Sequence, residues 1–257
     1  MNDAATVLAT DHDAVRLLTL NRPGKKNAFN VEMADALSTA LLDAANDDGV
    51  RAVVLHGAGD SFSSGADVHI FLALSQGRVE GIERFLSLDS KLRLFPKPLI
   101  AAVHGQAVGM GVTLLPHFDM VYAAEDATFL IPFSRLGLTP EFGSTWTLAR
   151  LIGRQRANEM VLVGEPLDAA TACEWGLVTR LFPAAEILKR SLAIGQLIAR
   201  HPRGAVMDSK ALLRDDEDLS LEEATARENS VLSGRYGSAE NVAAVEAFLA
   251  SRGTRRV

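Results

Sequence analysis

The stretch VHGQAVGMGVTLLPHFD, Val103–Asp119, decides the fold of this chain. The apolar run Pro98–Val103 leads into it and predicts a buried strand. Three glycines follow, and the apolar segment Val108–Leu115 then predicts a short helix. A glycine turn between a strand and a helix lets backbone approach a ligand closely, and the helix N-terminus points free N–H groups at it. The stretch therefore favours a site for an oxygen atom that develops negative charge.

Two other interpretations of the same glycines stay open. A dinucleotide-binding fingerprint needs G-x-G-x-x-G, a long helix and an acidic residue about 20 positions further on. Gly109 and Gly111 fit that pattern, but Leu114 occupies the place of the third glycine and the expected helix is short. A turn that merely requires small residues explains the glycines as well. The interpretation favoured above is an oxyanion hole, a site in which backbone amides hold a negative oxygen. It gains support over the other two only if the chain supplies a second amide donor elsewhere.

Composition bounds the class of protein. The 257 residues are 48% hydrophobic, enough for one large domain or a domain with an appendage. A net charge of −6 and the lack of a basic run argue against a nucleic-acid partner. The single cysteine, Cys173, excludes an intramolecular disulfide, and the scattered histidines predict no metal site. Without a signal-like N-terminus or an apolar run of 18 residues, the sequence predicts a cytoplasmic protein that does not enter the membrane.

Strand-like and helix-like segments alternate over residues 1–200 and predict an α/β core domain with a largely parallel sheet. The expected strands in its first half are Ala14–Leu20, Val50–His56, Pro98–Val103 and Phe118–Ala124, and the expected helices are Val31–Ala45, capped by Asn30, and Ile82–Phe95. Residues 201–257 predict a separate C-terminal helical region. The expected helices after residue 140 are Ser144–Leu151, Arg154–Val163, Asp168–Trp175, Ala184–Ala199, Pro202–Leu213, Ser220–Ser233 and Ala239–Ala250.

A second backbone donor is available in Gly57–Asp67, GAGDSFSSGAD. A strand enters this small-residue turn, and Gly65-Ala66 can present an amide as the chain moves into the next segment. The carboxyl ends of parallel strands share one edge of a sheet, where α/β proteins usually bind ligands. Two amides from separate β–α units can therefore converge there.

Four stretches resemble the crotonase superfamily, the enoyl-CoA hydratases and isomerases, in the right order and over nearly the whole chain. They are LNRPGKKNAF near the N-terminus, FSSGAD at Phe62–Asp67, the central HGQAVGMGVTLL, and PLDAATACEWGLVTRLFP at Pro166–Pro183. The resemblance implies a crotonase-like spiral of ββα units with a C-terminal helical trimerisation region. It also implies an acyl-CoA thioester substrate, no cofactor beyond the coenzyme A of that substrate, and a homotrimer or homohexamer.

The resemblance assigns roles to particular residues. The backbone N–H groups of Ala66 and Met110 would form the oxyanion hole that grips the thioester oxygen. Asp67 is expected to order its loop rather than to perform chemistry. The residues implied to bind the substrate or its coenzyme A are Lys25, Asn27, Ala28, Gly65, Asp67, Gly109 and Phe133.

The chain departs from the hydratases of the superfamily at the two positions where they carry glutamates, which here hold Thr113 and Phe133. Water addition needs carboxylates to activate water and relay a proton, and phenylalanine does neither. The stretch Pro132–Trp146 instead resembles the double-bond isomerases, which place one acidic residue at the position of Glu141. A different explanation of Glu141 is that Pro140-Glu141 opens a helix, where glutamate is common.

The sequence therefore predicts an enoyl-CoA isomerase in which Glu141 is the only acid/base. Two alternatives remain. One is a hydratase or hydrolase of the same fold that uses other groups, and the other is a non-catalytic protein that binds acyl-CoA.

Overall fold

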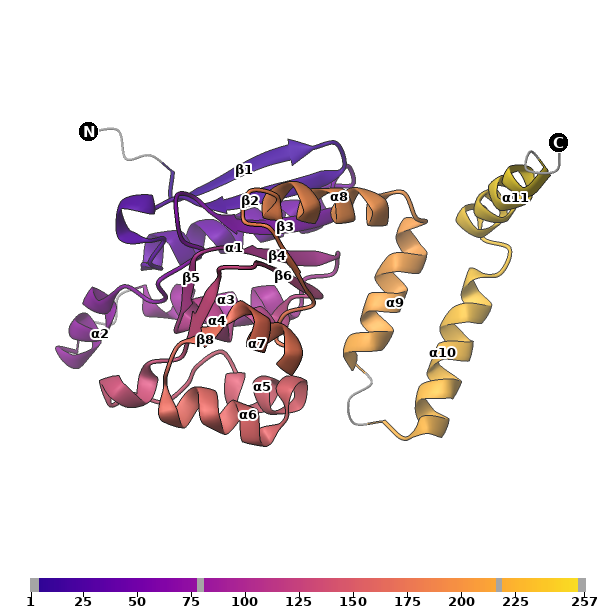
Figure 1. The fold of residues 1–257 in the computed structure, drawn as a ribbon. Coiled ribbons are helices and arrows are strands. Elements are labelled where there is room, and N and C mark those ends of the chain that lie inside the picture. The colour runs from indigo at the N-terminus through magenta and orange to yellow at the C-terminus, as the bar shows by residue number, and fades with distance from the viewer. Residues whose placement is uncertain (1–4, 78–80, 216–218, 254–257) are drawn as a thin grey trace.

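The computed structural model describes residues 5–77, 81–215 and 219–253, and shows a mixed α/β body from which the last helices project (Figure 1). The strands are β1 (Val7–His12), β2 (Val15–Leu20), β3 (Ala52–Gly57), β4 (Leu99–Val103), β5 (Gln106–Val108), β6 (Met120–Ala124), β7 (Thr128–Leu130), β8 (Leu167–Asp168) and β9 (Arg180–Phe182). The α-helices are α1 (Val31–Asn46), α2 (Val68–Ser75), α3 (Ile82–Arg93), α4 (Met110–Thr113), α5 (Ser144–Ile152), α6 (Arg154–Asn158), α7 (Ala169–Trp175), α8 (Ile187–Ala199), α9 (Arg203–Asp215), α10 (Leu221–Arg235) and α11 (Ala239–Gly253). Shorter helical turns are η1 (Pro23–Lys25), η2 (Leu115–His117), η3 (Phe133–Leu136) and the π-helical η4 (Glu159–Val163).

The large sheet has the strand order β1-β2-β3-β4-β6-β9. Strand β1 runs antiparallel to β2, and every other neighbouring pair in this sheet is parallel. Parallel neighbours need a crossover between them, and helices supply it after β2 and β3. This arrangement confirms the largely parallel sheet predicted from the sequence.

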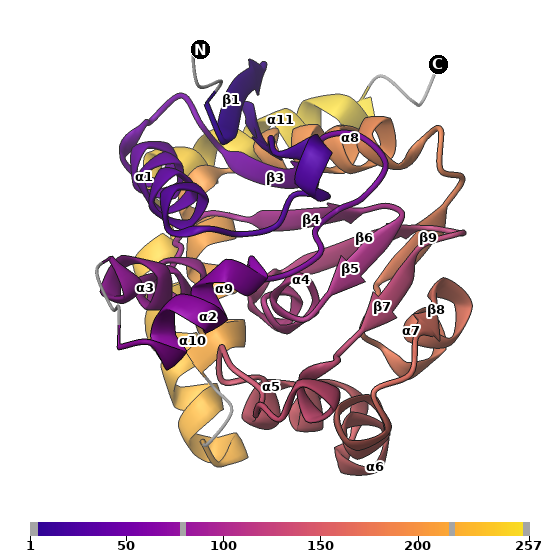
Figure 2. The same cartoon turned by 90° about the vertical axis from the view of Figure 1, so that its left-hand side faces the viewer.

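A second, three-stranded sheet lies next to the large one and has the order β5-β7-β8 (Figure 2). Two isolated bridges continue the same pairing toward the N-terminus, Ser63 with Ala107 and Phe29 with Ala66. The chain thus repeats one pattern: a strand of the large sheet, a short segment in or beside the small sheet, and then a helix. Because the short segments pair with one another, the loops after β2, β3 and β4 are stacked side by side.

Alternation along the buried strands gives the large sheet two apolar faces. Leu18, Leu20 and Val53 point into the cluster that includes the inner faces of α1 and α3. Leu17 and Val54 point to the opposite face, where α8 covers the sheet (Figure 1). Strands buried on both faces read as continuous apolar runs, which is why the sequence reveals them.

Helices α9, α10 and α11 leave the body after α8 (Figure 1). Lys210 of α9 fastens that helix to the body, because its ammonium donates to the Lys97 carbonyl and to Asp119, both at 2.7 Å. Helix α10 has no fully buried residue, and Phe248 and Leu249 of α11 are more than half exposed. Among the described residues, each helix is either too short or too polar to cross a membrane.

The structure adds to the sequence-based picture in three places. Strand β1, which the sequence did not predict, pairs with β2 over its whole length. The segment after Asp67, for which the sequence predicted no definite structure, contains helix α2. Glu141 does not open a helix, because α5 begins three residues later, at Ser144, after Gly143 in a left-handed conformation.

Candidate active site

The Ala66 amide is presented by a bridge at the end of the loop after β3. Phe29 donates its N–H to the Gly65 carbonyl and accepts from the Asp67 N–H, each at 2.8 Å. In such a parallel bridge the residue between the two partners turns its own N–H and C=O to the opposite side. The Ala66 amide therefore points away from Phe29.

Gly65 brings this loop against the segment that follows β5. Its φ of 88° is a left-handed conformation that glycine adopts without a steric penalty. A methyl group added here would lie 2.6 Å from the Val108 carbonyl oxygen and 3.3 Å from the Met110 nitrogen. The two loops thus meet at the Met110 amide, and only glycine allows so close an approach.

The Met110 amide is the first of helix α4. Gly109, with φ 52° and ψ −116°, turns the chain into the helix, and its carbonyl accepts from Val112 at 2.8 Å and Thr113 at 2.9 Å. The N–H groups at the start of a helix have no acceptor within it. Among the backbone hydrogen bonds of the described residues, neither the Ala66 nor the Met110 N–H donates. Two adjacent free amides are suited to hold an oxyanion.

Glu141 lies in the loop between η3 and α5. Its side chain is largely buried, and its Oε1 atom is inaccessible and has no hydrogen-bond partner among the described residues. Because burial disfavours the charged form, the pKa of the Glu141 carboxyl is raised from 4.5 to about 7. This carboxyl is therefore suited to take up and release a proton near neutral pH.

Two contacts tie the Glu141 loop to the segment that carries the Met110 amide. Before the loop, the Phe133 ring lies beside Gly109, 3.8 Å from where a β-carbon of Gly109 would be. After Glu141, the Phe142 carbonyl accepts from His117 Nε2 at 2.9 Å. Met110, Phe133 and Phe142 also belong to one apolar cluster. The Glu141 loop and the segment that carries the Met110 amide are thus packed against each other.

Asn27, predicted to bind coenzyme A, has a fully buried side chain. Its amide nitrogen donates to the Ala58 and Ser61 carbonyls at 2.8 and 2.7 Å, and its oxygen accepts from the Arg22 N–H at 3.0 Å. The side chain therefore links the loop after β2 to the loop after β3. Binding of coenzyme A by this residue stays a prediction.

The remaining predicted residues lie in or beside the same loops. Asp67 pairs with the Arg22 guanidinium at 3.3 Å, and its other oxygen accepts from the His69 N–H, contacts that suit a residue expected to order the loop. Binding of the substrate by Asp67 stays a prediction. Lys25 is exposed at the end of η1, and Ala28 is buried next to it. These placements leave Lys25 free to meet an anionic group at the rim, a role that stays a prediction.

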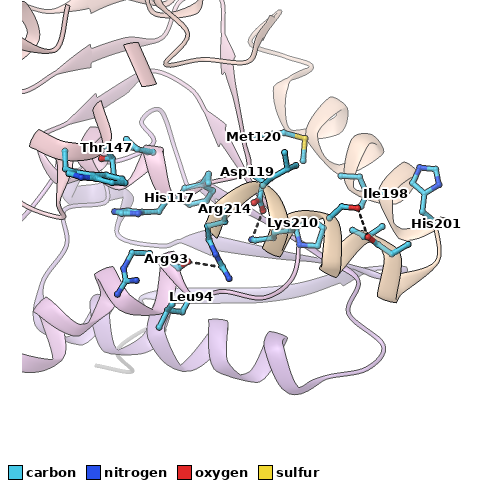
Figure 3. A pocket seen from close by; sticks show the side chains of 18 residues that line it. Arg93, Leu94, His117, Asp119, Met120, Thr147, Ile198, His201, Lys210 and Arg214 are labelled. Carbon is cyan, nitrogen blue, oxygen red and sulfur yellow. Dashed lines mark hydrogen bonds and ion pairs between the residues drawn. The ribbon is translucent and has the colours of Figure 1, made fainter. Parts of the chain in front are cut away.

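A cavity of about 860 Å³ opens between the body and α9, and its wall includes His117, Thr147, Lys210 and Arg214 (Figure 3). None of the site residues predicted from the sequence lines it. His117 belongs both to this wall and to the contact with Phe142, so the cavity adjoins the Glu141 loop. Sequence reasoning assigned no role to His117, because a lone histidine after the central motif carries no signal.

Two free amides and, on a loop packed against one of them, a largely buried carboxyl are groups suited to holding a carbonyl oxygen and to moving a proton. Residues 10–254 match the profile of the enoyl-CoA hydratase/isomerase family, and the chain belongs to that family. It is therefore a member of the crotonase superfamily, as the sequence motifs predicted.

Relatives and solved structures agree with this assignment. Human enoyl-CoA delta isomerase 2 is 40% identical over an alignment of 254 positions, which covers 96% of this chain and 64% of that protein. The chain thus spans somewhat less than two thirds of that relative. The 1,2-epoxyphenylacetyl-CoA isomerase of Escherichia coli K12 is 35% identical over 96% of both chains. The 2,3-dehydroadipyl-CoA hydratase of the same organism is 33% identical over 96% of both chains.

The fold is also that of solved members. The structure of a protein described as an enoyl-CoA hydratase/carnithine racemase, from Magnetospirillum magneticum AMB-1, matches with a TM-score of 0.89 at 34% identity. That match covers 96% of this chain and 97% of the other. The enoyl-CoA hydratase of Bacillus anthracis matches with a TM-score of 0.91 at 26% identity over 96% of both chains. The predicted crotonase-like fold with C-terminal helices is confirmed.

Proposed function

We propose that this protein is an enoyl-CoA isomerase, which moves a double bond of an acyl-CoA thioester from C3 to C2. The observation that carries the proposal is the Glu141 carboxyl, which is largely buried, has no hydrogen-bond partner among the described residues, and has its pKa raised to about 7. The positions that hold the two glutamates in hydratases of the superfamily carry Thr113 and Phe133 here.

The proposed reaction needs one base and one oxyanion hole. The Glu141 carboxylate takes a proton from C2, and the electrons of that C–H bond move toward the thioester oxygen to form an enolate. The Ala66 and Met110 amides stabilise the negative oxygen, at roughly 3 kcal/mol for each well-placed donor. The Glu141 carboxylic acid then returns the proton to C4, which leaves the double bond between C2 and C3.

A carboxyl with a pKa near 7 suits this sequence because the same group acts first as base and then as acid. A positioned acid/base contributes roughly 10²–10⁴ in rate, and most when its pKa lies near the working pH. Every proton transfer in the scheme uses Glu141, and the charge that develops is held by amides. The proposed chemistry therefore requires no metal or redox cofactor, and coenzyme A enters as part of the substrate.

The relatives support more than one activity, since enoyl-CoA isomerases and hydratases are both among them. An isomerase is favoured over a hydratase by the residues at positions 113 and 133, neither of which carries a carboxylate. A protein that binds acyl-CoA without turnover would not need a carboxyl whose pKa is raised by burial. The trimeric or hexameric assembly and the cytoplasmic location stay predictions.

The proposal is tested by incubating the protein with a panel of 3-enoyl-CoA and 2-enoyl-CoA thioesters of several chain lengths. An isomerase converts the 3-enoyl to the 2-enoyl ester with no change in mass, and the position of the double bond is determined by NMR. A gain of 18 mass units would identify a hydratase. Release of free coenzyme A would identify a hydrolase, and tight binding without conversion would identify a binding protein. Any of these three results in place of isomerisation would refute the proposal.

A further inference from the structure

The Glu141 carboxyl is not held in place by a hydrogen bond of its own. Its buried Oε1 has no partner among the described residues, and no charged group contributes to its raised pKa. The direction of the carboxyl therefore depends on the backbone that carries it.

The backbone just after Glu141 adopts a conformation that it would not choose alone. Phe142 has a φ of 57° and Gly143 a φ of 62°, two left-handed residues in succession. Glycine adopts this region freely, whereas a residue with a bulky side chain is disfavoured there. Such a conformation persists only where surrounding contacts impose it.

One side chain supplies such a contact. His117 Nε2 lies 2.9 Å from the Phe142 carbonyl oxygen. Because a carbonyl only accepts, Nε2 carries the proton and donates it. The His117 side chain is 4% exposed, and Nε2 is also 3.7 Å from Asp89 Oδ1 on α3, so both groups found near this nitrogen among the described residues are acceptors.

His117 also belongs to the segment that bears the oxyanion amide. Helix α4 starts at Met110, and the helical turn η2 follows it and ends at His117. The two are joined by backbone hydrogen bonds, from the Leu114 N–H to the Met110 carbonyl at 3.1 Å and from the His117 N–H to the Leu114 carbonyl at 3.2 Å. One short segment therefore presents the Met110 amide at its start and grips the Glu141 loop at its end. This segment is therefore one of the links that hold the Met110 amide and the Glu141 loop together.

We infer that His117 is a positioning residue for Glu141: its Nε2–H holds the Phe142 carbonyl, fixes the left-handed turn, and so aims the carboxyl relative to the Met110 amide. The inference rests on the proposed isomerase function of Glu141. His117 does not touch the substrate in this account. It acts on the placement of the base, so its loss should lower kcat and leave the KM for the thioester little changed.

Two isosteric replacements separate the hydrogen bond from mere packing. In His117→Gln the amide nitrogen falls where Nε2 was and can still donate to the Phe142 carbonyl. In His117→Asn the amide nitrogen falls at the position of Nδ1, too short to reach it. With a 3-enoyl-CoA as substrate, we expect His117→Gln to retain a kcat within a few-fold of wild type and His117→Asn to lose roughly 10- to 100-fold, since a displacement of about 1 Å can cost that much.

The same two changes are made in a Glu141→Gln background. If His117 acts through Glu141, His117→Asn should lower the residual kcat of Glu141→Gln by less than twofold, because effects on one unit are not additive. Should His117→Asn fail to fold, as judged by circular dichroism and thermal melting, His117→Leu replaces it as the variant without a donor.

The inference is overturned if the variant without a donor folds and keeps the wild-type kcat. It is likewise overturned if His117→Gln loses as much as that variant, or if the loss persists undiminished in the Glu141→Gln background. Failure of the proposed function looks different, because the wild-type protein would then not isomerise a 3-enoyl-CoA, or Glu141→Gln alone would isomerise it at the wild-type rate.

Discussion

Replacing Glu141 by glutamine should change the free energy of unfolding, relative to wild type, more favourably at alkaline pH than at acidic pH. Burial raises the pKa of this carboxyl from 4.5 to about 7, so the folded state disfavours its charged form. A group whose pKa is raised on folding contributes stability that is present below its unfolded pKa and is lost as the pH rises through the folded pKa. Wild-type protein therefore loses this contribution between about pH 4.5 and 7, and Glu141→Gln, which does not titrate, does not.

The size of the effect follows from the shift. A difference of about 2.5 pKa units at about 1.4 kcal/mol per unit gives an upper value of about 3 kcal/mol, of which roughly 2–3 kcal/mol develops between pH 5 and pH 8. Partial exposure of the carboxyl to water reduces it. The glutamine amide is also unpartnered when buried, at a cost of roughly 1–3 kcal/mol, but that cost is the same at both pH values. The pH-dependent difference is therefore the quantity to measure.

The assay is urea denaturation of both proteins at pH 5 and pH 8, at equal protein concentration because an oligomer's stability depends on it. The free energy of unfolding of Glu141→Gln minus that of wild type should be more positive at pH 8 than at pH 5 by up to about 3 kcal/mol. Equal differences at the two pH values, or a larger difference at pH 5, would show that the carboxyl is not desolvated in the folded protein.

Three further predictions concern the amide, a buried lysine and the assembly. Met110→Pro removes the N–H at the first position of α4, where proline is compatible with the helix, and should lower kcat by roughly 10²–10³-fold. The control Met110→Leu keeps the N–H and should have a kcat near wild type. Equal kinetics in the two variants would rule out the Met110 amide as an oxyanion donor. Lys97→Met removes a buried ammonium that donates to the Ala44 and Asp47 carbonyls at 2.6 Å at the end of α1, and should lower the free energy of unfolding by roughly 2–3 kcal/mol with kcat unchanged. Chemical denaturation checks this, and an unaltered midpoint would contradict it. Light scattering should give three or six times 27.5 kDa, and a stable monomer at micromolar concentration would refute the predicted assembly.

The elements that sequence analysis predicted well have a local or strongly periodic signal. Strands β2, β3 and β4 are buried on both faces and read as apolar runs, and α1 begins where the Asn30 side chain accepts from the Met33 N–H at 2.9 Å. Strand β1 escaped prediction because most of its side chains are exposed and its order comes from pairing with β2. Strands β5, β8 and β9 are two or three residues long, too short for any periodicity.

The candidate site was predictable only in part. The glycines at 65 and 109 marked two turns, but their contact depends on the pairing of Ser63 with Ala107, which no local pattern encodes. For Glu141 the sequence left two explanations open, and the structure separates them by starting α5 at Ser144.

Other features of the site had no sequence signal at all. The bond from His117 to the Phe142 carbonyl joins residues 25 positions apart. The links from the Asn27 side chain to the loop after β3 span more than 30 positions. Such contacts exist only once the fold has brought the loops together, and a residue type alone does not reveal them.

The central claim is that Glu141 moves the proton, and the rate of isomerisation by Glu141→Gln tests it most directly. The variant keeps the size and shape of the side chain but has no base, so kcat for conversion of a 3-enoyl-CoA to the 2-enoyl ester should fall by roughly 10²-fold or more. Affinity for a saturated acyl-CoA, measured by calorimetry on the same preparation, should be nearly unchanged, because the two amides and the other site residues remain. Isomerisation at an undiminished rate by Glu141→Gln would contradict the account.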